Sequence, residues 1–256
     1  MAPKELQNSC QKGMDKKILT AHQPSYLPWL GLFHKIALSD MFCYFDIVQY
    51  QRKDFNNRNK INTANGPIWL SVPVNSSNRF LTKINDIHIL DNNWRENHLK
   101  SILLNYKKTP FFDDYFPEIE KIISKRFEKL TDLNFEILLF GLKSFNIETN
   151  IVKASDFNFI GIKSELVLDM CKKLNCDLYI FGEQGKSYAD VDSFVSNKII
   201  PYFQKYESPI YSQKNKTFHP KMSFIDLLFN HGPNSLDILF EKNITRNELE
   251  KKLLDE

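Results

Sequence analysis

The chain has 256 residues, of which 42% are hydrophobic and 25% are charged. This composition is that of an ordinary globular protein and excludes extensive disorder, collagen-like repeats and coiled coils. The formal net charge of +3 is too small to indicate a dedicated nucleic-acid-binding protein, which usually carries a concentrated basic surface.

The ends of the chain are polar, and the folded pattern lies between them. Residues 1–16 lack the apolar core of a signal peptide, so we expect a flexible extension there. A single α/β domain is expected over residues 17–240, followed by a charged helix over residues 241–256. No stretch approaches the roughly 20 apolar residues of a membrane helix, and the four cysteines form no C-x-x-C pair. We therefore expect a cytoplasmic protein with reduced thiols.

The first elements predict a parallel pair of strands covered by a helix. Residues 18–21 are an apolar run, residues 30–39 repeat apolar side chains at helical spacing, and residues 41–48 are a second, nearly apolar run. Pro24 and Pro28 exclude a helix directly after the first strand. Strand, helix and strand in this order form a βαβ unit.

A β-hairpin is predicted after the second strand. Residues 61–74 contain Asn65-Gly66, a strong hairpin-turn signal, between β-rich flanks. Residues 84–90 alternate apolar and polar side chains, which predicts one more strand.

A helical insert is predicted at about residues 92–147. Residues 94–107 and 116–145 both have helical spacing of apolar side chains. Thr131 and the aspartate after it are good N-cap residues, so a break in the second helix is expected there.

The second half of the chain alternates short strands and helices, as βα units of a parallel sheet do. The expected strands are 150–154, 177–181 and 199–203, and the expected helices are 164–174, 190–197 and one that begins near Ser223. Together with the first half, this predicts a Rossmann-like, mostly parallel sheet with helices on both faces, a β-hairpin after the second strand and the helical insert.

The loop after the first strand is the first candidate site. His22 and Gln23 lie where a parallel sheet binds ligands, at the carboxyl end of a strand, and Tyr26 follows in the same loop. Side-chain donors and free backbone N–H groups before a helix can bind an anionic group. The alternative is a rigid, proline-rich turn with a hydrogen-bonded histidine.

Asp46 is the second candidate, because it interrupts an apolar strand. A buried carboxylate must be paired, hydrogen-bonded or neutral, and a desolvated one has a raised pKa that suits a general base. Gln49 and Arg52 follow it and are predicted to contact substrate. The alternative is a structural ion pair of Asp46 with Arg52 or Arg58.

The third candidate is the polar run that contains Asn57, Arg58 and Asn59. Arginine offers a two-pronged donor for phosphate or carboxylate, and asparagine amides can bind hydroxyl and carbonyl groups. A solvated loop rich in turn-forming residues is the alternative.

The fourth candidate follows the strand predicted at 177–181. Gly182 and Gly185 would let the backbone approach a ligand closely, with Glu183 and Tyr188 beside them. The spacing matches neither a Walker A motif nor a dinucleotide-binding motif, so the pattern is weak by itself.

Ser223 and Asp226 are the fifth candidate. Asp226 lies four residues before Asn230, so the two share a helical face. The alternative is that Ser223 caps the helix.

Several familiar chemistries have no signature in the chain. G-x-S-x-G, H-E-x-x-H and the protein-kinase motifs are absent, and the six histidines are scattered. We therefore predict no metal site. A cysteine–histidine dyad without a local signature stays open.

Five separated segments together resemble the WbqC-like family, over about residues 18–235. They are AHQPSYLPWLGLFHKI, FDIVQYQRKDFNNRNKI, WLSVPV, IFGEQGKSY and FHPKMSFIDLLFNHGP. The resemblance implies a cytoplasmic enzyme of bacterial O-antigen or other surface-polysaccharide biosynthesis that acts on a nucleotide-linked sugar.

Within that setting we favour transfer of an acyl or aminoacyl group to the amino group of a nucleotide-linked amino sugar. Such chemistry needs a base and donors for the tetrahedral oxyanion. His22 or Asp46 would be the base. The other expected roles are oxyanion donors, namely Gln23, Gln49 or Asn59, and holders of the pyrophosphate or acyl carrier, namely Arg52 and Arg58.

Two other functions stay open. The histidine-bearing loop before a helix has the general shape of nucleotidyltransferases, although His22 and His34 are twelve residues apart rather than three. A non-catalytic sugar-nucleotide-binding or scaffold protein is the third hypothesis. The sequence leaves open the sugar, the oligomeric state and the activated donor, which could be a thioester, a charged tRNA or an activated acid.

Overall fold

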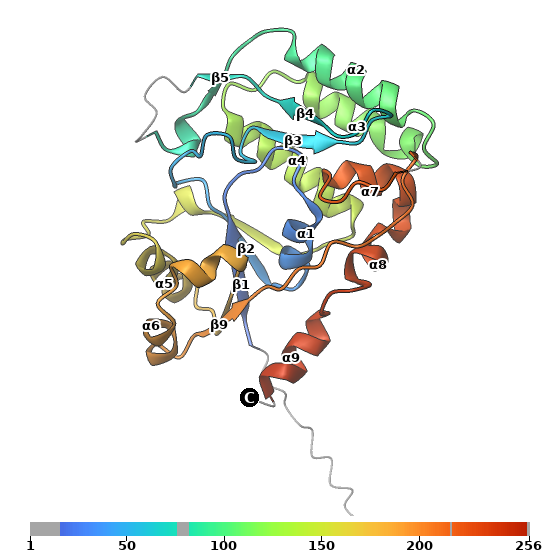
Figure 1. The fold of residues 1–256 in the computed structure, drawn as a ribbon. Coiled ribbons are helices and arrows are strands. Elements are labelled where there is room, and N and C mark those ends of the chain that lie inside the picture. Colours follow the sequence, from blue (N-terminus) through green and yellow to red (C-terminus); the bar gives the residue numbers. More distant parts are fainter. Residues whose placement is uncertain (1–15, 76–81, 216, 255–256) are drawn as a thin grey trace, which may run out of the picture.

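A five-stranded parallel sheet forms the centre of the computed structural model, which describes residues 16–75, 82–215 and 217–254 (Figure 1). The strand order is β7-β2-β1-β8-β9. Their bounds are β1 Ile18–His22, β2 Met41–Tyr44, β7 Asn150–Lys153, β8 Leu178–Phe181 and β9 Ile200–Phe203. Counted along the chain this order is 3-2-1-4-5, that of doubly wound nucleotide-binding sheets, and it reverses between β1 and β8.

Helices cover both faces of the sheet, which confirms the predicted α/β class. Leu19 and Ala21 of β1 pack in one hydrophobic cluster with α5 (Ser164–Lys173) and α6 (Val191–Ser196). On β2, Phe42 and Tyr44 point to the other face.

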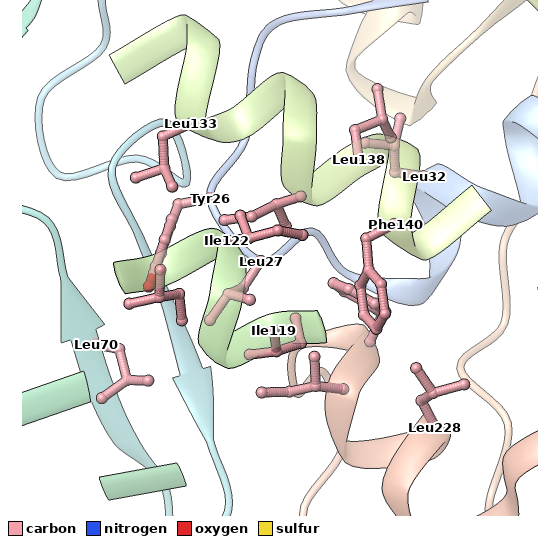
Figure 2. Close-up of a cluster of buried hydrophobic side chains, with 14 of the residues drawn as sticks. Tyr26, Leu27, Leu32, Leu70, Ile119, Ile122, Leu133, Leu138, Phe140 and Leu228 are labelled. Atoms are coloured by element: carbon pink, nitrogen blue, oxygen red, sulfur yellow. The ribbon is translucent and has the colours of Figure 1, made fainter. Parts of the chain in front are cut away.

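That second face holds the largest apolar cluster of the protein. Its helices are α1 (Leu30–Ala37), α3 (Phe112–Ser124), α4 (Leu130–Ser144) and α7 (Phe224–His231). Figure 2 shows Ile119 and Ile122 of α3 beside Leu133 of α4, with Tyr26 and Leu27 of the loop after β1 among them. This loop is therefore part of the core rather than a surface turn.

The predicted hairpin is present but begins earlier in the chain. β3 (Arg58–Ile61) pairs antiparallel with β4 (Ile68–Ser71), and Gly66 has φ +97° in the turn. Residues 58–60, predicted as part of a polar loop, are thus strand residues. The alternation of a strand explains the error, because Asn59 and Ile61 point inward while Arg58 and Lys60 point outward.

The strand predicted at 84–90 is mostly wrong. Ile84–Asp86 forms a 3₁₀ turn, and only His88–Ile89 (β6) pairs, with Val74–Asn75 (β5). Ile84 and Ile87 are both fully buried at a spacing of three, which suits a turn and not an alternating strand.

Three helices follow β6, as the predicted helical insert requires. They are α2 (Trp94–Tyr106), α3 and α4, although the break between α3 and α4 spans residues 125–129 rather than Thr131. Thr131 lies in the first turn of α4, where it is buried. Whether these helices form part of one domain with the sheet stays a prediction.

The helix predicted at 241–256 is present but shorter, and a further short helix precedes it. They are α8 (Ser235–Phe240) and α9 (Arg246–Leu254). Asn243 separates them by donating its side-chain amide to the carbonyls of Glu207 and Leu239. The predicted N-terminal extension lies almost wholly outside the described residues. No helix in the described ranges is long and apolar enough to cross a membrane.

Arg246 ties α9 to the amino end of the sheet. Its guanidinium donates to the Leu38 carbonyl at 2.9 Å, to the Lys16 carbonyl at 3.3 Å and to the Asp40 carboxylate at 3.0 Å. Both described ends of the chain therefore lie where the strands begin (Figure 1).

The close contact between Gly232, after α7, and the Phe111 ring can be tested by substitution. It has φ +50° and ψ −123° after α7, and a Cβ atom there would overlap the Phe111 ring. We expect Gly232→Ala to lower the free energy of unfolding by about 1–3 kcal/mol, measured by urea denaturation. Gly182→Ala is the control, because Gly182 has φ −70° and nothing lies within 4 Å of its added Cβ. Equal losses in both variants would contradict this account.

Candidate active site

The strand order reverses between β1 and β8, the switch point at which open α/β sheets form a ligand-binding crevice. The β1–β8 ladder ends at the pair Thr20–Ile180, whereas β1 stays paired with β2 as far as His22–Tyr44. Ala21 and His22 therefore have no ladder partner on β8. Open α/β sheets bind ligands at this position, outside the carboxyl ends of the strands.

His22 presents a neutral imidazole at this crevice. Its side chain is half-buried, and its Nδ1 lies 2.7 Å from the Gln23 carbonyl oxygen, so Nδ1 carries the proton and donates. Burial, together with the positive charge of Lys35, lowers the pKa of His22 to about 3. Nε2 has no hydrogen-bond partner among the described residues and keeps its lone pair.

Lys35 is a site residue that the sequence analysis missed. It lies on α1, its side chain is 4% exposed, and its Nζ donates to the Ala21 carbonyl at 3.0 Å. No carboxylate in the described part of the chain comes within ion-pair distance of it. Burial lowers the pKa of Lys35 to about 7. The available signal was α1 itself, which is apolar on nearly every side and so forces its one lysine into the interior.

The lysine caps the carbonyl that β8 leaves unpaired, and its charge lies close enough to His22 to lower the pKa of that imidazole. Within the described residues, neither Lys35 nor His22 is paired with a carboxylate. Such an arrangement suits an anionic ligand, whose charge would supply the missing partner.

Lys35→Met tests the burial of this amine. Since the folded pKa of about 7 lies below the unfolded value of about 10.4, the unfolded chain binds more protons between these values, and stability rises with pH above about 7. The wild type should gain about 2 kcal/mol relative to Lys35→Met between pH 7 and pH 9, at about 1.4 kcal/mol per proton and pH unit. Urea denaturation at pH 7, 8 and 9 measures it.

Lys100→Met, at an exposed lysine of α2, is the matched control and should follow the wild type. Parallel stability curves for the wild type and Lys35→Met would show that Lys35 stays charged and solvated.

Asparagines clamp the loop after β1 to the hairpin. The Asn56 amide donates to the Pro24 carbonyl at 2.8 Å and to Gln23 Oε1 at 3.2 Å, which fixes Gln23 beside His22. The Asn59 amide donates to the Leu27 carbonyl. Asn59 is fully buried, and its contacts are those of a structural residue rather than of the predicted substrate contact.

Tyr26 also has a structural role. It is fully buried, and its hydroxyl lies 2.8 Å from His98 Nδ1 on α2. The predicted substrate contact of Tyr26 therefore does not fit the structure. The apolar ring lies in the core cluster of Figure 2, and this position explains why the loop turns inward.

The other residues of the polar run lie apart from the crevice. The Asn57 amide donates to the Val72 carbonyl at 2.8 Å, and the Arg58 guanidinium stacks on Trp69 at 4.3 Å from the ring centroid. Arg52 is exposed, and Gln49 pairs with Lys83 in an isolated bridge. The structure does not gather these four residues into one phosphate-binding cluster.

Asp46 lies two residues beyond the end of β2, beside the segment that follows β7. Its two oxygens accept from the Ser155 backbone N–H at 2.9 Å and from the Ser155 hydroxyl at 2.7 Å. It makes no ion pair with Arg52 or Arg58 in the described ranges, so neither predicted pairing is found. The contacts favour a structural role, and its predicted role as a base has no geometric support.

A double-mutant cycle measures this bond. Asp46→Asn should cost about 1–3 kcal/mol of unfolding free energy, because a buried carboxylate that accepts two hydrogen bonds is replaced. The cost of Ser155→Ala should shrink in the Asp46→Asn background, with a coupling of about 1 kcal/mol in chemical denaturation. Additive losses would show that the pair does not stabilise the fold.

The loop after β8 begins at the same carboxyl edge of the sheet. Glu183–Ser187 is a 3₁₀ helix that begins with Glu183 exposed, directly after Gly182. Gly185 is needed for packing, since a Cβ there would lie 2.7 Å from Phe181 Cβ. Tyr188 is 42% exposed and packs edge-on against the Phe181 ring. Gly182 and Glu183 thus share the sheet edge with His22.

Asp226 is the centre of a buried network rather than a ligand contact. It is fully buried, and its oxygens accept from Tyr106 Oη at 2.7 Å, Tyr211 Oη at 2.8 Å and Gln213 Nε2 at 2.7 Å. Ser223 is fully buried as well, and its hydroxyl does not cap α7. These positions correct the predicted substrate contacts of both residues.

The described cysteines do not form a dyad with His22. Cys43, Cys171 and Cys176 are free and buried, and burial raises the pKa of the Cys43 thiol to about 12. Cys43 lies on the α5 face with Ala21, while His22 points to the opposite face. Among the described residues, no group of three or more histidines, cysteines or carboxylates could hold a metal ion.

The strand order defines a doubly wound α/β protein, and its candidate site lies at the switch point. The profile of the WbqC-like protein family matches residues 23–238. An uncharacterized protein of Mycobacterium tuberculosis, Rv1507c, is 30% identical over 219 residues, which is 85% of this chain and 95% of that protein. No solved structure matches. The chain belongs to the WbqC-like protein family.

Proposed function

We propose that the protein is an enzyme of surface-polysaccharide biosynthesis that transfers an acyl or aminoacyl group to the amino group of a nucleotide-linked amino sugar. The observation that supports catalysis is the neutral imidazole of His22, which has its Nδ1–H fixed by Gln23 and its Nε2 free at the switch point. Membership in the WbqC-like family supports the pathway, through the resemblance described above.

In the proposed reaction His22 Nε2 is the general base. The sugar amine attacks the carbonyl carbon of an activated acyl donor, such as a thioester, and forms the C–N bond. The amine proton passes to Nε2, and the C–S bond of the thioester breaks to release a thiolate, which takes up the proton. The fixed Nδ1–H holds the imidazole in the tautomer that accepts at Nε2.

Lys35 has the complementary task of holding the anionic part of the substrate. A pyrophosphate or carboxylate near its Nζ would raise the pKa of both Lys35 and His22, because a negative charge favours their protonated forms. This change would move His22 from a weak base toward the range in which a general base works well. Binding of an anion should therefore be accompanied by proton uptake.

The strand order and Lys35 also favour a second candidate, nucleotidyl transfer, since both suit a phosphate-bearing ligand. The two reactions differ in their products. Nucleotidyl transfer from ATP or CTP releases pyrophosphate, whereas amide formation from a thioester releases a thiol.

The test begins with thermal stability in the presence of UDP, GDP, dTDP, CMP, ATP and coenzyme A. A ligand at 100 times its Kd adds about 2.7 kcal/mol of stability. We expect one nucleoside diphosphate to stabilise the wild type and His22→Ala, and Lys35→Met to lose this stabilisation. Amide formation with the matching amino sugar nucleotide and acyl thioesters, followed by thiol release, should fall about 10²–10⁴-fold in His22→Ala.

Asp46→Asn serves as the control for turnover, because its contacts are structural. Its kcat, corrected for the folded fraction, should stay within a few-fold of the wild type. Unchanged kcat in His22→Ala would overturn the assignment of the base. Pyrophosphate release without amide formation would support nucleotidyl transfer in place of acyl transfer. If no nucleotide changes the thermal stability, the scaffold hypothesis is favoured.

A further inference from the structure

A cavity of about 450 Å³ lies between β4 and the start of α2. This volume falls in the range of small-molecule sites, about 300–1,000 Å³. Trp69 and Ser71 line it from the hairpin, and Trp94, Asn97 and His98 line it from α2. None of its lining residues is an aspartate, glutamate, lysine or arginine.

His98 does not add a charge to this cavity. Its Nδ1 pairs with Tyr26 Oη, and burial lowers the pKa of His98 to about 4, so the ring is neutral at physiological pH. The lining is therefore aromatic, amide and hydroxyl in character. Such groups recognise molecules that combine apolar C–H surfaces with hydroxyls.

Trp94 carries an unpaired hydrogen-bond donor. Its side chain is 5% exposed, and its Nε1–H is buried without a partner in the described ranges. Buried donors are nearly always paired in native proteins, so an unpaired one requires an explanation. A hydroxyl oxygen of a bound molecule would accept this bond.

Trp69 offers the apolar surface. It is 43% exposed, and the Arg58 guanidinium and the Lys60 ammonium lie 4.3 Å and 5.3 Å from its ring centroid. Both cations come from β3, where they hold the indole in place, while the cavity lies on the α2 side of β4. A large aromatic surface near amide groups can pack against the C–H face of a sugar ring.

We propose that this cavity binds an uncharged pyranose, a neutral sugar unit of a glycan. The hydroxyls would bond to Trp94 Nε1 and to the Asn97 amide, and the ring would pack on Trp69. A nucleotide fits less well, because Arg58 and Lys60 stack on the Trp69 ring and do not line the cavity, where its phosphates would lie. Sugar binding at this site requires neither the nucleotide nor the acyl donor of the proposed reaction. The proposal can therefore be tested independently of that function.

Saturation-transfer NMR with the wild-type protein tests the proposal directly. The probes are glucose, galactose, mannose and N-acetylglucosamine at millimolar concentration, without nucleotide or thioester. We expect saturation transfer to at least one sugar, with at least tenfold weaker binding by Trp94→Phe, which keeps an aromatic ring but removes the N–H. Asn97→Ala should weaken binding as well.

The controls separate this site from the crevice. Asn105→Ala, on the same helix but outside the cavity lining, and His22→Ala should both bind the sugar as the wild type does. Absence of transfer to all four sugars would overturn the proposal. So would binding that survives both Trp94→Phe and Asn97→Ala, or a cavity that binds UDP in place of the sugars.

Discussion

The early end of the β1–β8 ladder determines the character of this protein. Had the strands stayed paired for two more residues, the Ala21 carbonyl would accept a backbone N–H of β8 and could not accept from a side chain. The ladder stops at the pair Thr20–Ile180, and Lys35 Nζ donates to the Ala21 carbonyl instead. A buried ammonium group is costly to desolvate, and one carbonyl does not compensate for that cost. The fold therefore holds an amine where a ligand's charge would be most effective.

A set of asparagine side chains joins this crevice to the hairpin. Asn56 and Asn59 bond to the loop after β1, and the Asn134 amide bonds to the Asn56 carbonyl at 2.8 Å from α4. A row of aromatic rings follows the same path. The ring centroids are 5.0 Å apart for His22 and Trp29, 5.4 Å for Trp29 and Phe55, and 5.9 Å for Phe55 and Trp69. The sheet, the hairpin and the insert thus share one continuous connection.

The parallel sheet could be predicted because its three central strands, β1, β2 and β8, are mostly buried and are short apolar runs in the sequence. The bounds of β3 could not be predicted, because half of its residues are polar side chains that point outward. For the candidate site, His22 was predictable from its place after a strand and before two prolines. The switch point itself required the strand order, which depends on where β7 and β8 pair and not on any local pattern.

The roles of the carboxylates show a different limit of sequence reasoning. Asp46 and Asp226 both interrupt apolar segments, and a buried acid can equally be a base or a structural acceptor. The choice depends on Ser155 for Asp46 and on Tyr106 and Tyr211 for Asp226, and Ser155 and Tyr106 are more than 100 residues away in sequence. Lys35 was missed for the same reason, because its acceptor lies on another element.

The contacts of Arg246 have a practical consequence for how this molecule can be handled. Lys16 and α9 meet at the amino end of the sheet, while His22 and Gly182 lie at the carboxyl end. A fusion partner, surface tether or fluorescent label attached beyond either of these segments would start from the edge opposite the crevice. Such an attachment would not occupy the edge of the sheet at which His22 lies.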